Sequence, residues 1–343
     1  MPPYHHLFKP SLMKKLQVLK RLIAFACMGA TLLLLGFGAV SLQAQAFPAK
    51  PVRIVVPAGP GSAVDAVVRD LVPGLTELLG QQVVVDNKPG ANSTIGARDV
   101  ARAPADGHTL LHGNVNNALN DLLSPNPCCK LGEALLPVTR MTATPLVMVV
   151  HPSVPANNLK EFLALAKSQP DRITQASGGN GSITHLLGEM MNYTAGIKLR
   201  DVPYKAIGAE LPDLLAGHVM VAYLAPVVVA QHIKQGKLRA LGMAGSKRVA
   251  IISEVPTMAE AGLSGVEASG WNGLFVPAGT PVSIINRIQA DVAKVLQSPA
   301  YKAQAASVGS ELGGESPQEF AAFIRAEMAK WGRLIKDANI KTE

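Results

Sequence analysis

Two glycine-rich turns hold the residues of this sequence that are best suited to chemistry. The first is "PAGPGSAVD", which contains Ala58, Gly59, Gly61, Ser62 and Asp65. It follows a short β-branched run and precedes an apolar helical pattern, so it indicates a strand, a tight turn and the start of a helix. The first N–H groups of a helix lack partners, and the helix dipole makes that end positive. The turn therefore favours anion binding.

The second turn is "ASGGNGSITH", which also leads from a strand through glycines into a helix. Its candidate binding residues are Ser177, Asn180, Gly181, Ser182 and His185. Asn180 and Ser182 can add side-chain donors to the free N–H groups, and two such turns could hold the two ends of a small anion. The alternative is that Ser182 is only a helix cap. A Ser182→Ala change that weakens binding and leaves the melting temperature unchanged would favour the binding role.

Signatures of a nucleotide site or a hydrolase are incomplete. The Gly59-x-Gly61 pair lacks the third glycine of a dinucleotide fingerprint, although Asp86 resembles its ribose-binding acid. The chain has no G-x-S-x-G and no H-E-x-x-H. We therefore expect no catalytic residue, no cofactor and no metal site.

Two titratable side chains in the turns, those of His185 and Asp65, can have roles other than catalysis. His185 lies close to Ser182, but no acid is evidently placed to orient its ring. It more readily lines or caps the site. Asp65 lies in the first turn of its helix, where a negative charge suits the dipole. A structural role therefore suits Asp65 better than catalysis.

The hydrophobic pattern alternates strands and helices, which predicts an α/β fold with two parallel-rich sheets flanked by helices. Ligands bind at the carboxyl ends of strands in such sheets, where both turns fall. Pro73 inside the first helix predicts a kink or break at Val72, and two helices close the chain. No internal repeat is visible. The expected strands are 52–56, 82–86, 109–112, 173–176, 219–224 and 238–244, and the expected helices are 63–79, 95–102, 159–167 and 183–193.

Composition separates the N-terminus from the rest of the 343-residue chain. Residues 1–46 hold five basic and no acidic residues, and the apolar run "LIAFACMGATLLLLGFGAV" is followed by "AQA". This is typical of a secretory signal peptide cleaved near Ala46; an uncleaved anchor, or a start at Met13, stays open. The net charge of the remainder is only about +3 of the total +8, which gives no case for nucleic-acid binding.

The sequence contains three cysteines. Cys27 lies in the signal segment, whereas Cys128 and Cys129 are neighbours. Because a disulfide between adjacent residues is strained, the pair is either two free thiols in a loop or a strained bridge. No Cys or His stands at ligand spacing nearby, so a metal site is not expected.

Taken together, these residues resemble the substrate-binding proteins of tripartite tricarboxylate transporters, the Bug receptor family. The resemblance covers nearly all of the chain after residue 46. It lies in the order and spacing of "FPAKPVRIVVPAGPGSAVD", "LGQQVVVDNKPGANSTIGA", "ARAPADGHTLL", "TPLVMVVHPSVPA", "SGGNGSITHLLGEM", "VPYKAIGAELPDLLAGHV", "HIKQGKLRALGM", "EVPTMAEAG", "WNGLFVPAGTP" and "FAAFIRAEMAKWGRLIK".

The resemblance implies a periplasmic two-lobed receptor of the Venus-flytrap type. Domain 1 would comprise 47–147 plus 272–343, domain 2 would comprise 148–271, and extended runs would cross between them. A small carboxylate would be captured between the lobes and delivered to the two integral membrane subunits of the transporter. We expect a monomer. A secreted enzyme acting on a small carboxylate or ester, and a ligand-sensing adaptor, remain the alternatives.

The resemblance also extends the binding set beyond the two turns. The family's loop after the third strand matches Gly113 to Asn117, which implies roles for Asn114 and Asn116, and "VPYK" adds Tyr204. The sequence departs from the family pattern in three places. Ser62 replaces a glycine and Ala206 replaces another, while Met220, Ala222 and Leu224 occupy a region that is often acidic. Loss of those acids predicts an apolar wall and disfavours amino-acid ligands.

Overall fold

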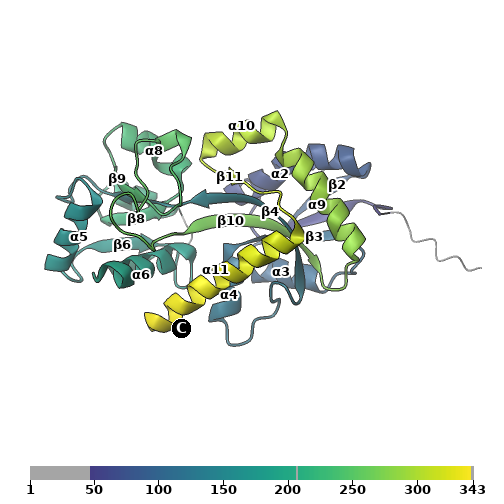
Figure 1. Ribbon diagram of the computed structural model, residues 1–343, viewed down its shortest axis with the longest axis horizontal. Helices are drawn as coiled ribbons and strands as arrows, with labels where there is room; N and C mark the ends of the chain where they lie inside the picture. Colours follow the sequence, from purple (N-terminus) through teal and green to yellow (C-terminus); the bar gives the residue numbers. More distant parts are fainter. Residues whose placement is uncertain (1–46, 206–207, 341–343) are drawn as a thin grey trace, which may run out of the picture. The chain divides into compact units, whose positions relative to one another are not determined.

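The computed structural model describes residues 47–205 and 208–340, which build two β-sheets (Figure 1). The first sheet has the strand order β11-β4-β10-β3-β1-β2, formed by β1 (Val52–Val56), β2 (Val83–Asn87), β3 (Thr109–Asn114), β4 (Leu135–Pro145), β10 (Ser269–Pro277) and β11 (Glu311–Leu312). The second has the order β7-β6-β8-β5-β9, formed by β5 (Val147–Val150), β6 (Thr174–Ser177), β7 (Arg200–Pro203), β8 (Val221–Leu224) and β9 (Arg239–Met243).

Both sheets combine parallel and antiparallel pairs. β1 runs parallel to β2 and β3, and β6 runs parallel to β7 and β8. The antiparallel pairs involve the strands at which the chain changes sheets: β4 ends at Pro145, β5 begins at Val147, and β10 returns beside β4 (Figure 1). The predicted α/β class is confirmed, but the sheets are mixed and not parallel-rich, because the strands that change sheets pair antiparallel with their neighbours. The extended runs "PLVMVV" and "WNGLFV" lie at these crossings.

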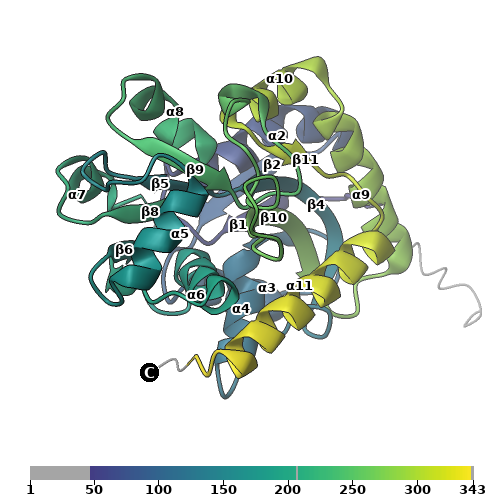
Figure 2. The ribbon, with the colours of Figure 1, turned by 60° about the vertical axis from the view of Figure 1, so that its left-hand side comes forward.

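Helices cover both faces of each sheet (Figure 2). In the first sheet, α2 and α9 pack on one face, while α3, α4 and α11 pack on the other. In the second, α5 and α6 share one face, and α8 packs on the other. The helices are α2 (Ala63–Leu79), α3 (Thr94–Ala101), α4 (Val115–Leu123), α5 (Leu159–Ser168), α6 (Ile183–Ala195), α7 (Leu211–Leu215), α8 (Pro226–Lys234), α9 (Val282–Leu296), α10 (Pro299–Val308) and α11 (Pro317–Asp337), with a 3₁₀ turn at Ala250–Ile252.

The core follows the two-residue period of the strands. In β1, Ile54 faces the cluster under α2 and α9, whereas Val55 faces the cluster under α3 and α4. Strands with both faces buried read as continuous apolar runs, as they do here. Trp331 is fully buried in α11, and Trp271 of β10 meets Phe320 edge-on with ring centroids 5.8 Å apart.

Of the kink or break expected at Val72, the break does not occur, because α2 runs without interruption from Ala63 to Leu79. A proline inside a helix costs about 3 kcal/mol, so tertiary contacts must offset that cost. A Cβ on Gly74 would lie only 3.0 Å from Val295 Cγ2, so the glycine lets α9 pack closely on α2. The Tyr301 hydroxyl donates a hydrogen bond to the carbonyl of Val67, 3.1 Å away.

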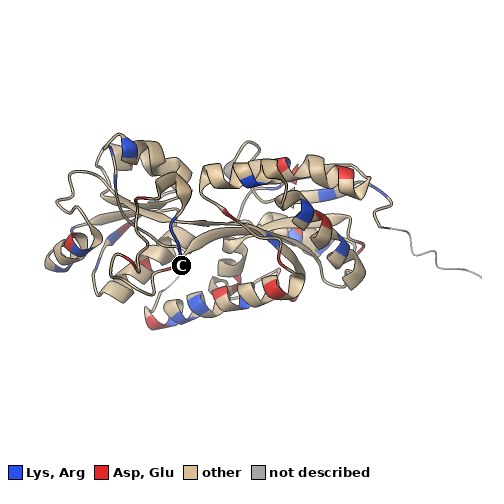
Figure 3. Ribbon diagram, turned by 45° about the horizontal axis from the view of Figure 1, so that its top comes forward, with Lys and Arg blue, Asp and Glu red and all other residues tan. Residues whose placement is uncertain are grey.

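Three helices, α9, α10 and α11, close the described part of the chain, rather than the two expected. Basic and acidic residues both occur along α11 (Figure 3). None of the helices in the described ranges combines the length and apolar composition that a membrane span needs.

His112 of β3 is fully buried, and neither ring nitrogen has a hydrogen-bond partner in the described residues. Burial lowers its pKa from 6.5 to about 4. Below about pH 6.5 the unfolded chain therefore binds a proton at His112 that the native state does not bind. The free energy of unfolding consequently falls as pH drops from about 6.5 towards 4. We expect His112→Leu to reduce this loss of melting temperature between pH 7 and pH 4. Equal pH profiles for the two proteins would contradict the assignment.

Candidate functional site

The first glycine turn is closed by hydrogen bonds in both directions. Ser62 is the N-cap of α2, and its Oγ accepts from the Asp65 N–H at 3.3 Å. In return, the Gly61 N–H donates to Asp65 Oδ2 at 2.8 Å. Gly61 has a φ of +78°, a left-handed conformation that glycine adopts without strain. The sequence therefore fixes the turn through two small residues and one acid.

Asp65 is committed to the protein itself. It is only 1% exposed, and its oxygens also accept from Arg69 Nε at 2.7 Å and Asn87 Nδ2 at 2.9 Å. The hydrogen bond from Arg69, helped by those from Asn87 and Gly61, outweighs burial and lowers the pKa of Asp65 to about 2. Asn87 Nδ2 also lies 3.0 Å from the carbonyl of Ala58. The carboxylate thus holds the turn in place.

The second turn repeats this geometry. Ser182 caps α6 with φ −71° and ψ 158°, against −70° and 161° for Ser62. The His185 N–H donates to Ser182 Oγ at 3.2 Å, and the Gly181 N–H donates to His185 Nδ1 at 3.3 Å. Gly181 has a φ of +73°. The segments "GPGSAVD" and "GNGSITH" therefore share one local geometry, as their common strand–turn–helix pattern predicts.

The two turns differ in the groups that support them. In the second, the Gly178 N–H donates to Thr184 Oγ1 at 2.8 Å, and Ser177 Oγ donates to Asp201 Oδ2 at 2.9 Å. Since His185 Nδ1 is an acceptor, a neutral His185 carries its proton on Nε2. Burial raises the pKa of Asp201, whose other oxygen is buried without a partner among the described residues.

Tyr204 adjoins the second turn. Its N–H donates to the carbonyl of Ser177 at 2.8 Å, and its hydroxyl donates to Asp213 Oδ2 at 2.6 Å. Burial, followed by the contact with Asp213, raises the pKa of Tyr204 to about 12. The hydroxyl oxygen can still accept a hydrogen bond, but its proton is already used.

Asn114 and Asn116 lie at the start of α4, at the carboxyl end of β3. Asn114 is the N-cap: its Oδ1 accepts from the Asn116 N–H at 3.0 Å, and its N–H donates to Asn117 Oδ1 at 2.9 Å. Asn116 Oδ1 is buried with no partner in the described part of the chain. Because α4 contacts α6, this segment of the first sheet lies beside the helix of the second turn.

The structure thus brings the predicted residues together within each segment, and no hydrogen bond among the described residues joins the first turn to the second. Two cavities, of about 260 Å³ and 680 Å³, lie elsewhere. The smaller is between α3 and α4, and the larger is bounded by α2, α9 and α10. In the described residues, no cluster of three His, Cys, Asp or Glu side chains could hold a metal ion.

Sequence reasoning missed the residues that support the turns. They are Arg69, Asn87, Thr184, Asp201 and Asp213. Arg69 could have been found, because it stands four residues after Asp65 on a helix, a spacing that favours ion pairs. The others come from strands and helices whose proximity depends on the sheet order.

Of the three residues expected to form an apolar wall, Met220 is partly buried against the cluster that α5 and α6 cover, whereas the other two lie in the core on the opposite face. Ala222 is fully buried and Leu224 is 1% exposed, and both belong to the core cluster on the α8 face of the second sheet. Successive residues of a strand face opposite sides, and these two face away from α6. They give no reason to disfavour amino-acid ligands.

Comparisons with known proteins identify the relatives of this chain. The family profile "Tripartite tricarboxylate transporter family receptor" matches residues 67–340. Protein BugT of Bordetella pertussis is 34% identical over 305 residues, covering 88% of this chain and 94% of that protein. Among solved structures, the periplasmic binding protein BugD superposes with a TM-score of 0.74 at 30% identity, covering 87% of this chain and all of that one. An R. palustris protein solved with adipate gives 0.77 at 30%, covering 86% and 99%.

The fold and these likenesses define a solute-binding receptor of the periplasmic-binding-protein type, whose solved relatives are periplasmic proteins. The chain belongs to the tripartite tricarboxylate transporter receptor family, also called the Bug family, as the sequence predicts. It is a receptor that binds its solute, and not an enzyme.

We expect Asp65→Asn to lower the melting temperature at neutral pH, because the amide has no charge to pair with Arg69 and can accept at only one of the two oxygen positions that Arg69 and Asn87 reach. The folded pKa of Asp65, about 2, lies below the usual 3.8, so the carboxylate stabilises the fold above about pH 4. That contribution is lost as pH falls towards 2, where the two proteins should converge. Asp70→Asn, an exposed control on the same helix, should change little. Equal losses for both variants would contradict the assignment.

Proposed function

We propose that this receptor captures a small carboxylate between the two equivalent turns. The observation that carries the proposal is the repeated strand–turn–helix geometry. In the turns, Val64 and Thr184 occupy the second position of their helices, and neither backbone N–H donates a hydrogen bond within the described residues. Such paired helix starts suit the oxygens of an anion. Relatives support this ligand class, since one solved structure contains adipate and another, MatC of Rhodopseudomonas palustris, contains malate.

The predicted residues then fall into two groups. Asp65, and His185 through its Nδ1, hold the glycine N–H groups and so position each turn. The contacting groups would be the backbone and hydroxyls of the two turns together with the loop before α4 and Tyr204, that is Ala58, Gly59, Gly61, Ser62, Ser177, Asn180, Gly181, Ser182, Asn114, Asn116 and Tyr204.

Hydrogen bonds account for the affinity without a buried arginine. Each hydrogen bond to a charged ligand contributes about 1.5–3 kcal/mol. Four or five of them give micromolar binding after the entropic cost of association. The bound carboxylate can stay ionised, because several hydrogen-bond dipoles together stabilise its negative charge.

Closure of two lobes would complete the site. We place the lobe boundaries at 47–147 plus 272–343 and at 148–271, with the hinge in the strands that change sheets, β4–β5 and β10. The ligand favours the closed form only by its extra contacts there. The closed form would dock, as a monomer, on the two integral membrane subunits of the transporter.

Export would precede this step. We propose cleavage of the signal segment near Ala46, which releases the protein into the periplasm. In support, the compact unit starts at Phe47, the next residue. The Phe47 ring packs edge-on against His108, with centroids 5.0 Å apart, so the unit is anchored from its first residue.

A ligand panel tests the proposal. We expect calorimetry to show micromolar binding of at least one short dicarboxylate, with adipate and malate tested first. The matching diamide should bind at least tenfold more weakly, because it lacks the charge that the helix starts stabilise. A diamide that binds as tightly as its acid would contradict an anion site, and so would a panel of carboxylates in which none binds.

Three serine caps separate binding from stability. Ser62→Ala and Ser182→Ala each remove a cap, and so does Ser298→Ala at α10, away from the turns. Each should cost about 1 kcal/mol of folding stability, so the unchanged melting temperature first expected for Ser182→Ala no longer holds. Only the first two should also lower affinity for the dicarboxylate, about tenfold or more. Equal affinity in all three would restrict both serines to capping.

A further inference from the structure

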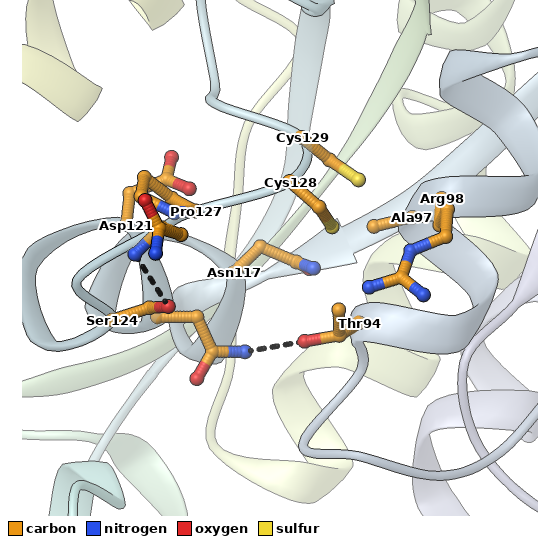
Figure 4. A pocket seen from close by; sticks show the side chains of 11 residues that line it. Thr94, Ala97, Arg98, Asn117, Asp121, Ser124, Pro127, Cys128 and Cys129 are labelled. Atoms are coloured by element: carbon orange, nitrogen blue, oxygen red, sulfur yellow. Dashed lines mark hydrogen bonds between the residues drawn. The ribbon is translucent and has the colours of Figure 1, made fainter.

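The smaller cavity lies outside the two turns, between α3, α4 and the loop that follows α4 (Figure 4). Its volume is about 260 Å³. Arg98 of α3 and Asn117 of α4 contribute polar groups to its wall, while the loop contributes Cys128 and Cys129. The side chains of both cysteines project towards Ala97 of α3 (Figure 4). A cavity with two thiols on one wall is therefore open to a small reagent.

The two thiols differ in exposure. Cys128 is exposed and Cys129 is buried, and both are free. Burial, followed by a contact with the Cys128 side chain, raises the pKa of Cys129 to about 12. The loop behind them is tied down, because the Leu131 N–H donates to Asp121 Oδ2 at 2.8 Å. The third cysteine of the sequence, Cys27, precedes the described residues.

We propose that Cys128 and Cys129 form a reversible dithiol–disulfide pair, which a small disulfide oxidant reaches through this cavity. Neighbouring Cα atoms stand about 3.8 Å apart, closer than the usual 4.4–6.8 Å of a disulfide. The resulting ring is strained, and strained, exposed disulfides are the easily reduced ones. The pair thus responds to the redox poise around the receptor and does not act as a structural crosslink.

The exchange takes place in two balanced steps. The exposed Cys128 loses its proton to solvent, attacks one sulfur of oxidised glutathione and releases one glutathione thiolate. Cys129 then loses its proton, attacks Cys128 Sγ and expels the second glutathione, so two protein thiols become one disulfide and one oxidised glutathione becomes two thiols. The Arg98 charge favours the Cys129 thiolate that burial opposes. A thiolate of high pKa is intrinsically the stronger nucleophile.

The experiment uses the full chain with Cys27→Ser, treated with oxidised glutathione, quenched with an alkylating agent and weighed by intact-mass spectrometry. We expect the parent to lose both alkylatable thiols and the mass of two hydrogen atoms, with no glutathione retained. Dithiothreitol should restore both thiols. When Cys129→Ser is combined with Cys27→Ser, the protein should retain one glutathione on Cys128. When Cys128→Ser is combined with Cys27→Ser, the remaining thiol should react with oxidised glutathione at least tenfold more slowly.

A second measurement is independent of oxidation. A trivalent arylarsenical bridges two neighbouring thiols, so it should protect the reduced parent from alkylation and leave both single-serine variants unprotected. Unchanged melting temperatures would show that all variants are folded. A parent that keeps two thiols, accumulates a stable glutathione adduct or forms a disulfide-linked dimer would overturn the proposal.

Discussion

The reciprocal closure of each turn is the interaction on which the site depends. A serine Oγ accepts from the third N–H of the helix, and the side chain at that position accepts from the glycine before the serine. This arrangement resembles a capping box, except that the returning hydrogen bond comes from the N–H of the residue before the N-cap. It uses the N–H groups that would otherwise compete for the ligand and leaves the second N–H of each helix free. In the proposed site, a few precisely placed dipoles would take the role of a charged ligand-binding side chain.

The same scaffold is supported differently on the two sheets. Asp65 stays ionised above about pH 4, because Arg69 pairs with its charge and Asn87 donates a hydrogen bond to it. The support of the first turn by Asp65 is therefore insensitive to pH in that range. The second turn is held by His185 Nδ1, and burial raises the pKa values of two carboxyl groups near it, Glu189 and Asp201. The two turns therefore share a geometry but differ in the groups that support them.

Local signals allowed much of this to be predicted from sequence. Serines before helices and glycines after strands mark both turns, because capping and positive φ depend on adjacent residues. The likeness of the two turns is visible in the sequence, but the matching roles of Asp65 and His185 are not, because the two side chains differ chemically although both accept from a glycine N–H. The uninterrupted course of α2 past Val72 and the core positions of Ala222 and Leu224 were not predicted for another reason: Val295 and Tyr301 stabilise α2, and sheet register decides which face a strand residue occupies.

The central claim concerns two backbone groups, so it is tested most directly at those atoms. Amide-resolved NMR of the receptor, titrated with the tightest dicarboxylate, reports on Val64 and Thr184 together. Simultaneous downfield shifts and slowed hydrogen exchange at both amides, at one ligand per chain, are the result that the account predicts. Shifts confined to the cavity between α3 and α4, or to a single turn, would contradict it.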